Sequence, residues 1–160
     1  MATVSIKGVD RLTQRFNKIA KMELRSAVSK ATLLVHGQAK ALAPADTGQL
    51  RASIHTQVKD TGKAVEGRVY TNVEYASYVE FGTGVTGSGT YPYQVKGLNL
   101  TYRNKGWAYY DEDKGEYIFT KGQKAQPYMY PALKQNEKAI KKILNDGVHT
   151  QLKANCKGGQ

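Results

Sequence analysis

Cysteine, proline and long apolar runs are scarce in this sequence of 160 residues. The single cysteine, Cys156, excludes an internal disulfide framework and a metal site built from cysteines. No apolar run approaches the roughly 18 residues that a membrane-spanning helix needs. The N-terminus also lacks the charged-then-apolar layout of a signal peptide. We therefore expect a protein of cytosolic origin, without a membrane among its partners.

Acidic residues are few, with 13 Asp and Glu against 24 Lys and Arg, and the formal net charge is +11. Residues 1–43 hold eight basic and two acidic residues (+6), and residues 130–160 hold six and two (+4). Two interpretations stay open: solvated helix faces that keep the protein soluble, or contact with nucleic acid or an acidic partner. The candidate contacts for the second form a basic series without a recognisable base-reading module: Lys7, Arg11, Arg15, Lys18, Lys21 and Arg25.

Catalytic and ligand-binding motifs are also lacking. Asp46-Thr47-Gly48 matches the triplet of aspartic proteases, but it follows Pro44 at a predicted helix end and indicates a turn. The glycines between Gly82 and Gly89 are followed by no Gly-Lys-Ser/Thr, so they do not indicate a phosphate loop. The three histidines show no metal-ligand spacing. We predict no enzyme, no catalytic, cofactor or metal site, no cofactor and no small-molecule substrate.

Apolar periodicity predicts two amphipathic helices. Residues 10–43 are interpreted as one kinked helix or two in tandem, with a break near Lys21-Met22. Gly37 within this stretch predicts close backbone packing or a bend. The second helix begins near Pro131, which suits a first helical turn, and its predicted buried stripe includes Leu133 and Val148.

Alternating patterns predict strands at Thr3–Ile6, Ile54–Lys59, Ala64–Thr71, Trp107–Tyr110 and Tyr117–Thr120. Together these elements predict an α+β fold. It has an antiparallel β-sheet of about four to five strands, a long N-terminal helix and a C-terminal helix packed on one face, and a short helix near residues 73–81. We expect a single domain over residues 1–160, with a flexible loop at about 83–105 and a frayed tail at about 155–160.

The short helix and the loop after it are rich in aromatic residues. All eleven tyrosines fall between Tyr70 and Tyr130. Tyrosine is favoured where one end of the ring is buried and the other is wet, as at protein interfaces, but it is also an ordinary strand former. The candidate interface residues are Tyr75, Tyr78, Glu80, Phe81, Thr83, Tyr91, Tyr93 and Tyr102.

Three segments in this order, Ala43–Ile54, Thr71–Gly84 and Gln126–Leu133, resemble a known family. It is the gene-ten-product-like family of tail components from long-tailed bacteriophages, also called head–tail joining or tail-completion proteins. The resemblance covers roughly residues 3 to 150, and nothing in residues 84–126 contributes to it. It implies helices packed on one face of an antiparallel sheet.

The resemblance also implies a structural virion protein of a siphophage, without enzymatic activity. Such a protein forms a ring, commonly a hexamer, at the head-proximal end of the tail tube. There it acts as a tail terminator that ends tube growth, and it docks to the head connector or stopper. The implied partners are further copies of the chain, the tail-tube protein, the connector and the DNA that passes through the junction. The alternative is a basic nucleic-acid-binding module that tracks DNA phosphates, whose binding would weaken steeply with salt.

Overall fold

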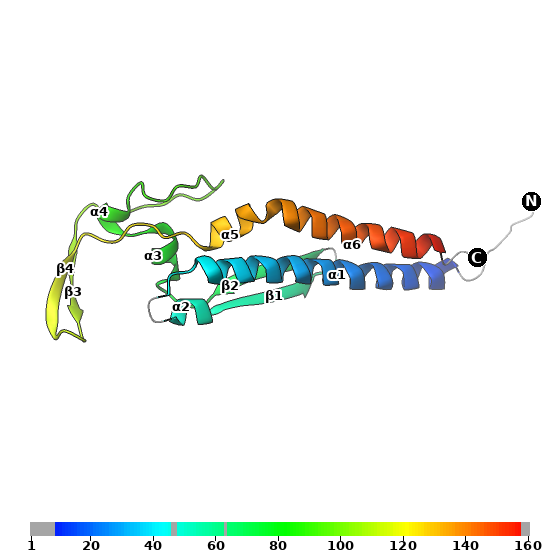
Figure 1. Ribbon diagram of the computed structural model, residues 1–160, viewed down its shortest axis with the longest axis horizontal. Coiled ribbons are helices and arrows are strands. Elements are labelled where there is room, and N and C mark those ends of the chain that lie inside the picture. Colours follow the sequence, from blue (N-terminus) through cyan, green and yellow to red (C-terminus); the bar gives the residue numbers. More distant parts are fainter. Residues whose placement is uncertain (1–8, 46–47, 63, 158–160) are drawn as a thin grey trace, which may run out of the picture. The chain divides into compact units, whose positions relative to one another are not determined.

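The computed structural model describes residues 9–45, 48–62 and 64–157, with side chains described between residues 24 and 150. Within these ranges no helix combines the length and the apolar character that crossing a bilayer requires. The elements, labelled in Figure 1, are α1 (Val9–Leu42), α2 (Gln49–Ala52), β1 (Ile54–Asp60), β2 (Val65–Thr71), α3 (Ala76–Phe81), α4 (Gly84–Gly87), β3 (Trp107–Asp111), β4 (Glu116–Thr120), α5 (Met129–Gln135) and α6 (Glu137–Lys157).

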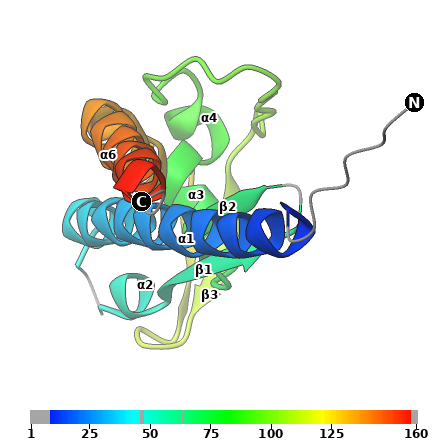
Figure 2. The ribbon, with the colours of Figure 1, turned by 90° about the vertical axis from the view of Figure 1, so that its right-hand side faces the viewer.

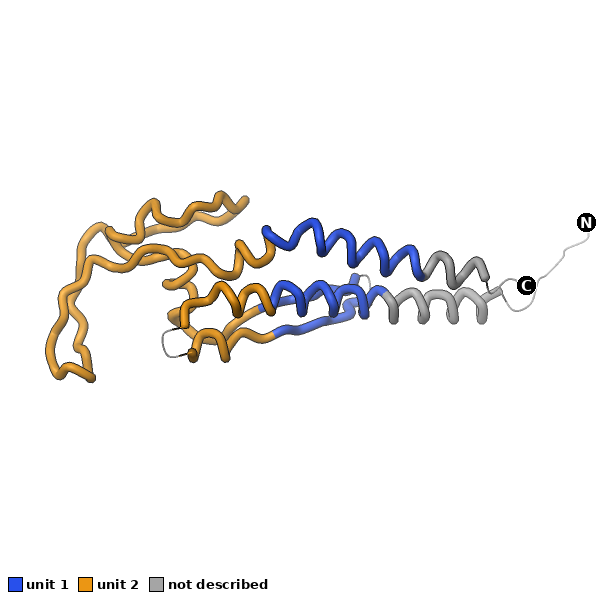
Figure 3. The backbone as a smooth tube through the Cα atoms, in the orientation of Figure 1, with its two compact units in different colours: residues 1–36, 56–69, 135–160 blue, residues 37–55, 70–134 orange. Residues whose placement is uncertain are grey.

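The described residues group into two compact units, which Figure 3 shows in two colours. The first unit is drawn from residues 1–36, 56–69 and 135–160, and the second from residues 37–55 and 70–134. Helix α6 lies wholly in the first unit. Helices α2, α3 and α4 and the β3–β4 hairpin lie wholly in the second.

Small side chains let α1 and α6 approach closely in the first unit. Ala27, Ala31 and Val35 are buried at four-residue spacing, which places them on one face of α1. A Cβ atom on Gly147 of α6 would lie 2.6 Å from the Cβ of Ala27. Helix α6 therefore packs directly on α1, as Figures 1 and 2 show.

Strand β2 reaches α1 through Gly67. A Cβ atom at this position would collide with Thr32 Oγ1 and would lie 3.1 Å from a methyl carbon of Val28. The Thr32 hydroxyl donates a hydrogen bond of 2.7 Å to the Val28 carbonyl, so the buried polar group is satisfied within the helix. The absence of a side chain at residue 67 lets the strand backbone lie against α1.

Several helical details differ from the sequence-based expectation. Helix α1 runs unbroken for 34 residues, without an interruption near Lys21-Met22. Gly37 marks no close packing, because no heavy atom lies within 4 Å of a Cβ built there. The predicted C-terminal helix is divided into α5 and α6, and α6 continues past residue 155 to Lys157. Leu133 and Val148 were predicted to be buried, but they are 52% and 43% exposed.

The sheet is the main correction to the predicted fold. The described residues form two antiparallel sheets of two strands each, β1–β2 and β3–β4, instead of one sheet of four to five strands. The expected strand Thr3–Ile6 lies outside the described residues. Residues 72–106, which separate β2 from β3, hold two short helices and no strand. The β3–β4 hairpin also exposes aromatic residues on both faces, whereas a strand inside a larger sheet buries at least one.

In the second unit, the core is a small cluster of buried apolar side chains. Its most buried large members are Ile54 and Tyr128, each 1% exposed. Arg51 Nε donates a hydrogen bond of 2.7 Å to the carbonyl of Ala43, just after the end of α1. Because the last carbonyls of a helix have no partner within it, this bond stabilises the helix end. Smaller buried members complete the core: Ala39, Ala43, Leu50, Ala76 and Ala132.

The first part of the segment predicted as a flexible loop is hydrogen-bonded into the second unit. The Thr83 N–H donates to the Gln123 carbonyl at 2.9 Å, and the Ala125 N–H donates to Thr90 Oγ1 at 2.9 Å. Gly82 has a φ of 76°, and a Cβ atom there would lie 2.7 Å from the Ala125 nitrogen. Both the backbone conformation and the close approach require glycine at this position.

We predict that Gly67→Ala destabilises the protein by about 1–3 kcal/mol, because the added methyl group overpacks the contact with Thr32. Adding Thr32→Ala to this variant should cost less than the sum of the two single changes, because it removes the colliding hydroxyl. Gly37→Ala is the matched control and should stabilise the protein by up to about 1 kcal/mol. Urea unfolding measures all four variants. Equal costs for Gly67→Ala and Gly37→Ala would contradict the proposed contact.

A groove of aromatic residues as a candidate protein interface

The site is built on a buried carboxylate. Glu80 on α3 is 5% exposed, and it accepts three backbone hydrogen bonds from the start of α5. Its Oε2 accepts from the N–H groups of Tyr128 at 2.7 Å and Met129 at 2.8 Å, and its Oε1 accepts from Tyr130 at 3.1 Å. The first N–H groups of a helix have no intrahelical partner and favour negative charge. Glu80 therefore fixes α3 against the start of α5.

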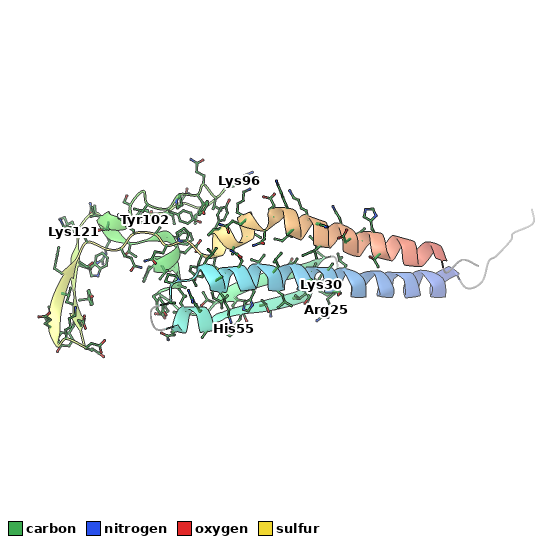
Figure 4. The ribbon with its side chains drawn as sticks, in the orientation of Figure 1. Arg25, Lys30, His55, Lys96, Tyr102 and Lys121 are labelled. Atoms are coloured by element: carbon green, nitrogen blue, oxygen red, sulfur yellow. The ribbon has the colours of Figure 1, made fainter. Side chains whose placement is uncertain are left out.

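An aromatic row begins beside Glu80. The ring of Phe81 lies edge-on to Tyr91 with centroids 5.1 Å apart, Tyr91 lies 5.6 Å from Tyr93, and Tyr93 lies 4.9 Å from Tyr130. These separations are typical of favourable aromatic pairs. The row holds the chain after α4 against α3 and α5. Tyr102, labelled in Figure 4, adds a second contact, because its hydroxyl donates a hydrogen bond of 2.9 Å to the Phe81 carbonyl.

A groove of about 1230 Å³ lies within the second unit. One wall is α3 with the residues around it, including Tyr75 and Tyr78, and another is the base of the hairpin, including Trp107 and Tyr109. Tyr75, Tyr78 and Tyr109 are 36%, 58% and 45% exposed. Among the described residues that line the groove, Arg103 carries the single charged side chain, and its guanidinium lies 5.6 Å from the Trp107 ring centroid.

The structure brings together most of the predicted interface residues. Tyr75, Tyr78, Phe81, Thr83 and Tyr102 all line the groove. Tyr91 and Tyr93 belong to the aromatic row instead. Glu80 is buried inside the subunit and does not line the groove; its carboxylate accepts hydrogen bonds from the start of α5.

Sequence reasoning missed the contribution of the hairpin and of the segment that precedes it. Leu100, Arg103, Trp107 and Tyr109 line the groove, although none was among the predicted residues. The strand pattern at residues 107–110 and 117–120 carried a signal, because aromatic residues occupy both faces of the predicted hairpin. A strand that buries one face in its own subunit normally has polar residues on the other.

The basic series is only partly described. Lys7 lies outside the described residues. Arg11, Arg15, Lys18 and Lys21 lie on α1 as backbone positions, and Arg25 is exposed on α1 (Figure 4). Arg25 is the one member of the series whose side chain is described, so the described side chains do not form a basic site.

The described part of the chain forms neither a metal-binding site nor a protease-like site. No group of three or more His, Cys, Asp or Glu side chains there could hold a metal ion. Asp46 and Thr47 of the protease-like triplet lie outside the described residues. The groove itself presents aromatic faces, hydroxyls, amides and one guanidinium.

A family model matches the N-terminal part of the chain. The model of the HK97 gp10-like family, described as "Bacteriophage HK97-gp10, putative tail-component", matches residues 6–82. The matched region includes α1, the β1–β2 hairpin and α3, and it ends at Gly82, where the groove-lining loop begins. No curated protein and no solved structure matched the chain.

We predict that Glu80→Ala destabilises the protein by about 3 kcal/mol or more, because three N–H groups lose a charged acceptor. Glu80→Gln should cost less, because the amide keeps one acceptor oxygen. Glu74→Gln, at an exposed glutamate six residues earlier in the sequence, is the control and should stay within about 0.5 kcal/mol of the wild type. Denaturant unfolding provides the comparison, and a neutral Glu80→Ala would contradict the structural role.

We also predict loss of stability at alkaline pH. Burial, with the nearby charge of Glu80, raises the pKa of Tyr128 to about 12, compared with 10.0 for an ordinary tyrosine. The unfolded chain releases this proton near pH 10 and the folded chain near pH 12, so stability falls as pH rises through that window. Tyr128→Phe should make this fall in stability shallower. Tyr117 is 77% exposed, so Tyr117→Phe should leave the fall unchanged. Unfolding curves below and within the window test this, and an equal fall in all three proteins would refute it.

Proposed function

Because residues 6–82 belong to the HK97 gp10-like family of bacteriophage tail components, we propose that this chain is a structural protein of the phage tail. In this proposal it forms a ring at the head-proximal end of the tail tube, ends growth of the tube and docks to the head connector. It works by protein–protein contact and not as an enzyme. Its location is the virion, after synthesis in the host cytoplasm.

The observation that carries this proposal is the composition of the groove. Tyrosine, tryptophan and arginine are the residues most enriched among those that dominate binding energy at protein interfaces. The groove presents Tyr75, Tyr78, Trp107, Tyr109 and Arg103 together. Several of these side chains are exposed in the isolated chain, so a partner that covers them gains buried apolar area. The buried Glu80 and the aromatic row hold the walls in place before a partner arrives, which lowers the entropic cost of binding.

A ring is the assembly that a groove of this kind favours. The groove is concave, so it fits a different, convex surface and not a copy of itself. A contact between two different surfaces of identical subunits is heterologous, and it closes into a ring when the rotation allows. Contact with DNA at the junction is a separate expectation that rests on the net charge of +11.

The test is assembly with the tail-tube protein and the head connector of the same phage, followed by electron microscopy. We expect rings at one end of the tubes and tubes of defined length. Tyr78→Ser should reduce ring formation without unfolding the chain, because Tyr78 is 58% exposed in the groove. Leu33→Ser, at a residue 55% exposed on α1, is the matched control outside the groove.

Failure of the wild-type chain to join either the tube or the connector would exclude the assembly role. Equal loss of assembly in Tyr78→Ser and Leu33→Ser would place the interface elsewhere. Binding to DNA that falls steeply with salt, with no effect on tube assembly, would favour the nucleic-acid alternative.

A further inference from the structure

The β3–β4 hairpin carries an aromatic face that its own chain does not cover. In the antiparallel register, Ala108 pairs with Phe119 and Tyr110 pairs with Tyr117, so these four side chains share one face. The rings of Tyr110 and Tyr117 lie edge-on with centroids 5.2 Å apart. Tyr110, Tyr117 and Phe119 are 53%, 77% and 66% exposed. An isolated two-stranded hairpin is marginally stable in water, so burial of this face would stabilise it.

The opposite face of the same hairpin belongs to the groove. Trp107 and Tyr109 line the groove of their own subunit, as does Thr120, which pairs with Trp107. Because side chains alternate along a strand, Tyr110, Tyr117 and Phe119 point away from that groove. The chain therefore cannot cover both faces with its own groove, and the aromatic face is available to another molecule.

The tip of the hairpin has the charge opposite to that of the rest of the chain. Residues 111–116 hold four acidic side chains and one basic side chain, a net charge of −3, whereas the whole chain carries +11. Asp111 is used internally, since its Oδ1 accepts hydrogen bonds from the N–H groups of Asp113 and Lys114 and so shapes the turn. Glu112, Asp113 and Glu116 are exposed.

The groove offers the complementary charge. Arg103 lines it. Lys121 lies between the lining residues Thr120 and Gly122, and Lys105 lies two residues from each of the lining residues Arg103 and Trp107; both lysines are exposed. Figure 4 shows Lys121 at the base of the hairpin, in the same unit as Tyr102. No aspartate, glutamate or histidine is among the described lining residues. An acidic aromatic tip thus matches a groove of aromatic residues and cations in both charge and chemistry.

We propose that the β3–β4 hairpin of one copy of this chain inserts its aromatic face and acidic tip into the groove of the next copy. Each copy then gives a hairpin to one neighbour and receives one from the other, which is a heterologous contact of the kind that closes a ring. This inference rests on the proposed ring and names the surfaces that would join its subunits. The occupant of the groove is a second copy of the chain.

A charge-swap experiment tests the contact. The hairpin variant Glu112→Lys with Asp113→Lys keeps Asp111 and the turn, and the groove variant is Arg103→Glu with Lys105→Glu. Each variant alone should associate with itself at least about tenfold more weakly than the wild type, because like charges then meet. Mixing the two variants should restore assembly, because each hairpin meets a groove of opposite charge. Glu66→Lys, an exposed reversal on β2, is the control and should assemble as the wild type does.

Assembly is measured by sedimentation and electron microscopy under the conditions in which the wild-type chain forms rings, alone or with tail-tube protein. Restoration in the mixture supports the contact even if one variant folds less stably, because misfolding would not be rescued by a partner. Rings formed normally by both variants would overturn this inference and leave the proposed function intact. The inference is also overturned if the groove variant loses only its binding to tail-tube protein, because the occupant is then that protein. Absence of wild-type rings under every condition would refute the proposed function as well.

Discussion

A carboxylate at the start of a helix organises the second unit. Glu80 projects from α3 and accepts hydrogen bonds from three consecutive N–H groups at residues 128–130, which are separated from it by almost fifty residues of chain. A buried carboxylate is costly unless it is fully hydrogen-bonded, and the free N–H groups at a helix start are costly unless they find an acceptor. Each group satisfies the other, so α3 and α5 are held at one geometry. The walls of the groove and the aromatic row depend on that geometry.

In the first unit, glycines let the backbones of β2 and α6 approach α1 closely. Gly67 lets β2 lie against α1, and Gly147 lets α6 lie against Ala27. Among the described residues, the side chains nearest these two glycines are those of Ala27, Val28 and Thr32. Such packing is tight but buries little area for each residue, and close-packed interiors tolerate added volume poorly. The large aromatic side chains are instead concentrated in the second unit, where many of them stay exposed.

That division fits the proposal of a protein that assembles. A chain of this size can bury most of its large apolar side chains, so exposed aromatic residues on a hairpin and along a groove call for a partner. The hairpin lies beyond residue 82, where the family match ends. The groove draws on both parts of the chain, with Tyr75 and Tyr78 inside the match and Trp107 and Tyr109 beyond it. The region that matches the family of putative phage tail components therefore supplies one wall of the groove, and the unmatched region supplies the hairpin.

The sequence by itself predicted the four strands between residues 54 and 120 to within about one residue at each end, because period-two alternation and glycine turns are local signals. The helices there were predicted less well, since α3 begins at Ala76 and not near residue 73, and α4 lies in the segment predicted as a loop. The sequence also singled out the tyrosine-rich segment, the family and five residues that line the groove. Only the tertiary structure decided how many strands pair, that Glu80 serves α5 from within the subunit, and that the hairpin supplies a wall of the groove. These depend on contacts between residues far apart in the chain, and no local pattern encodes which distant N–H groups a carboxylate will meet.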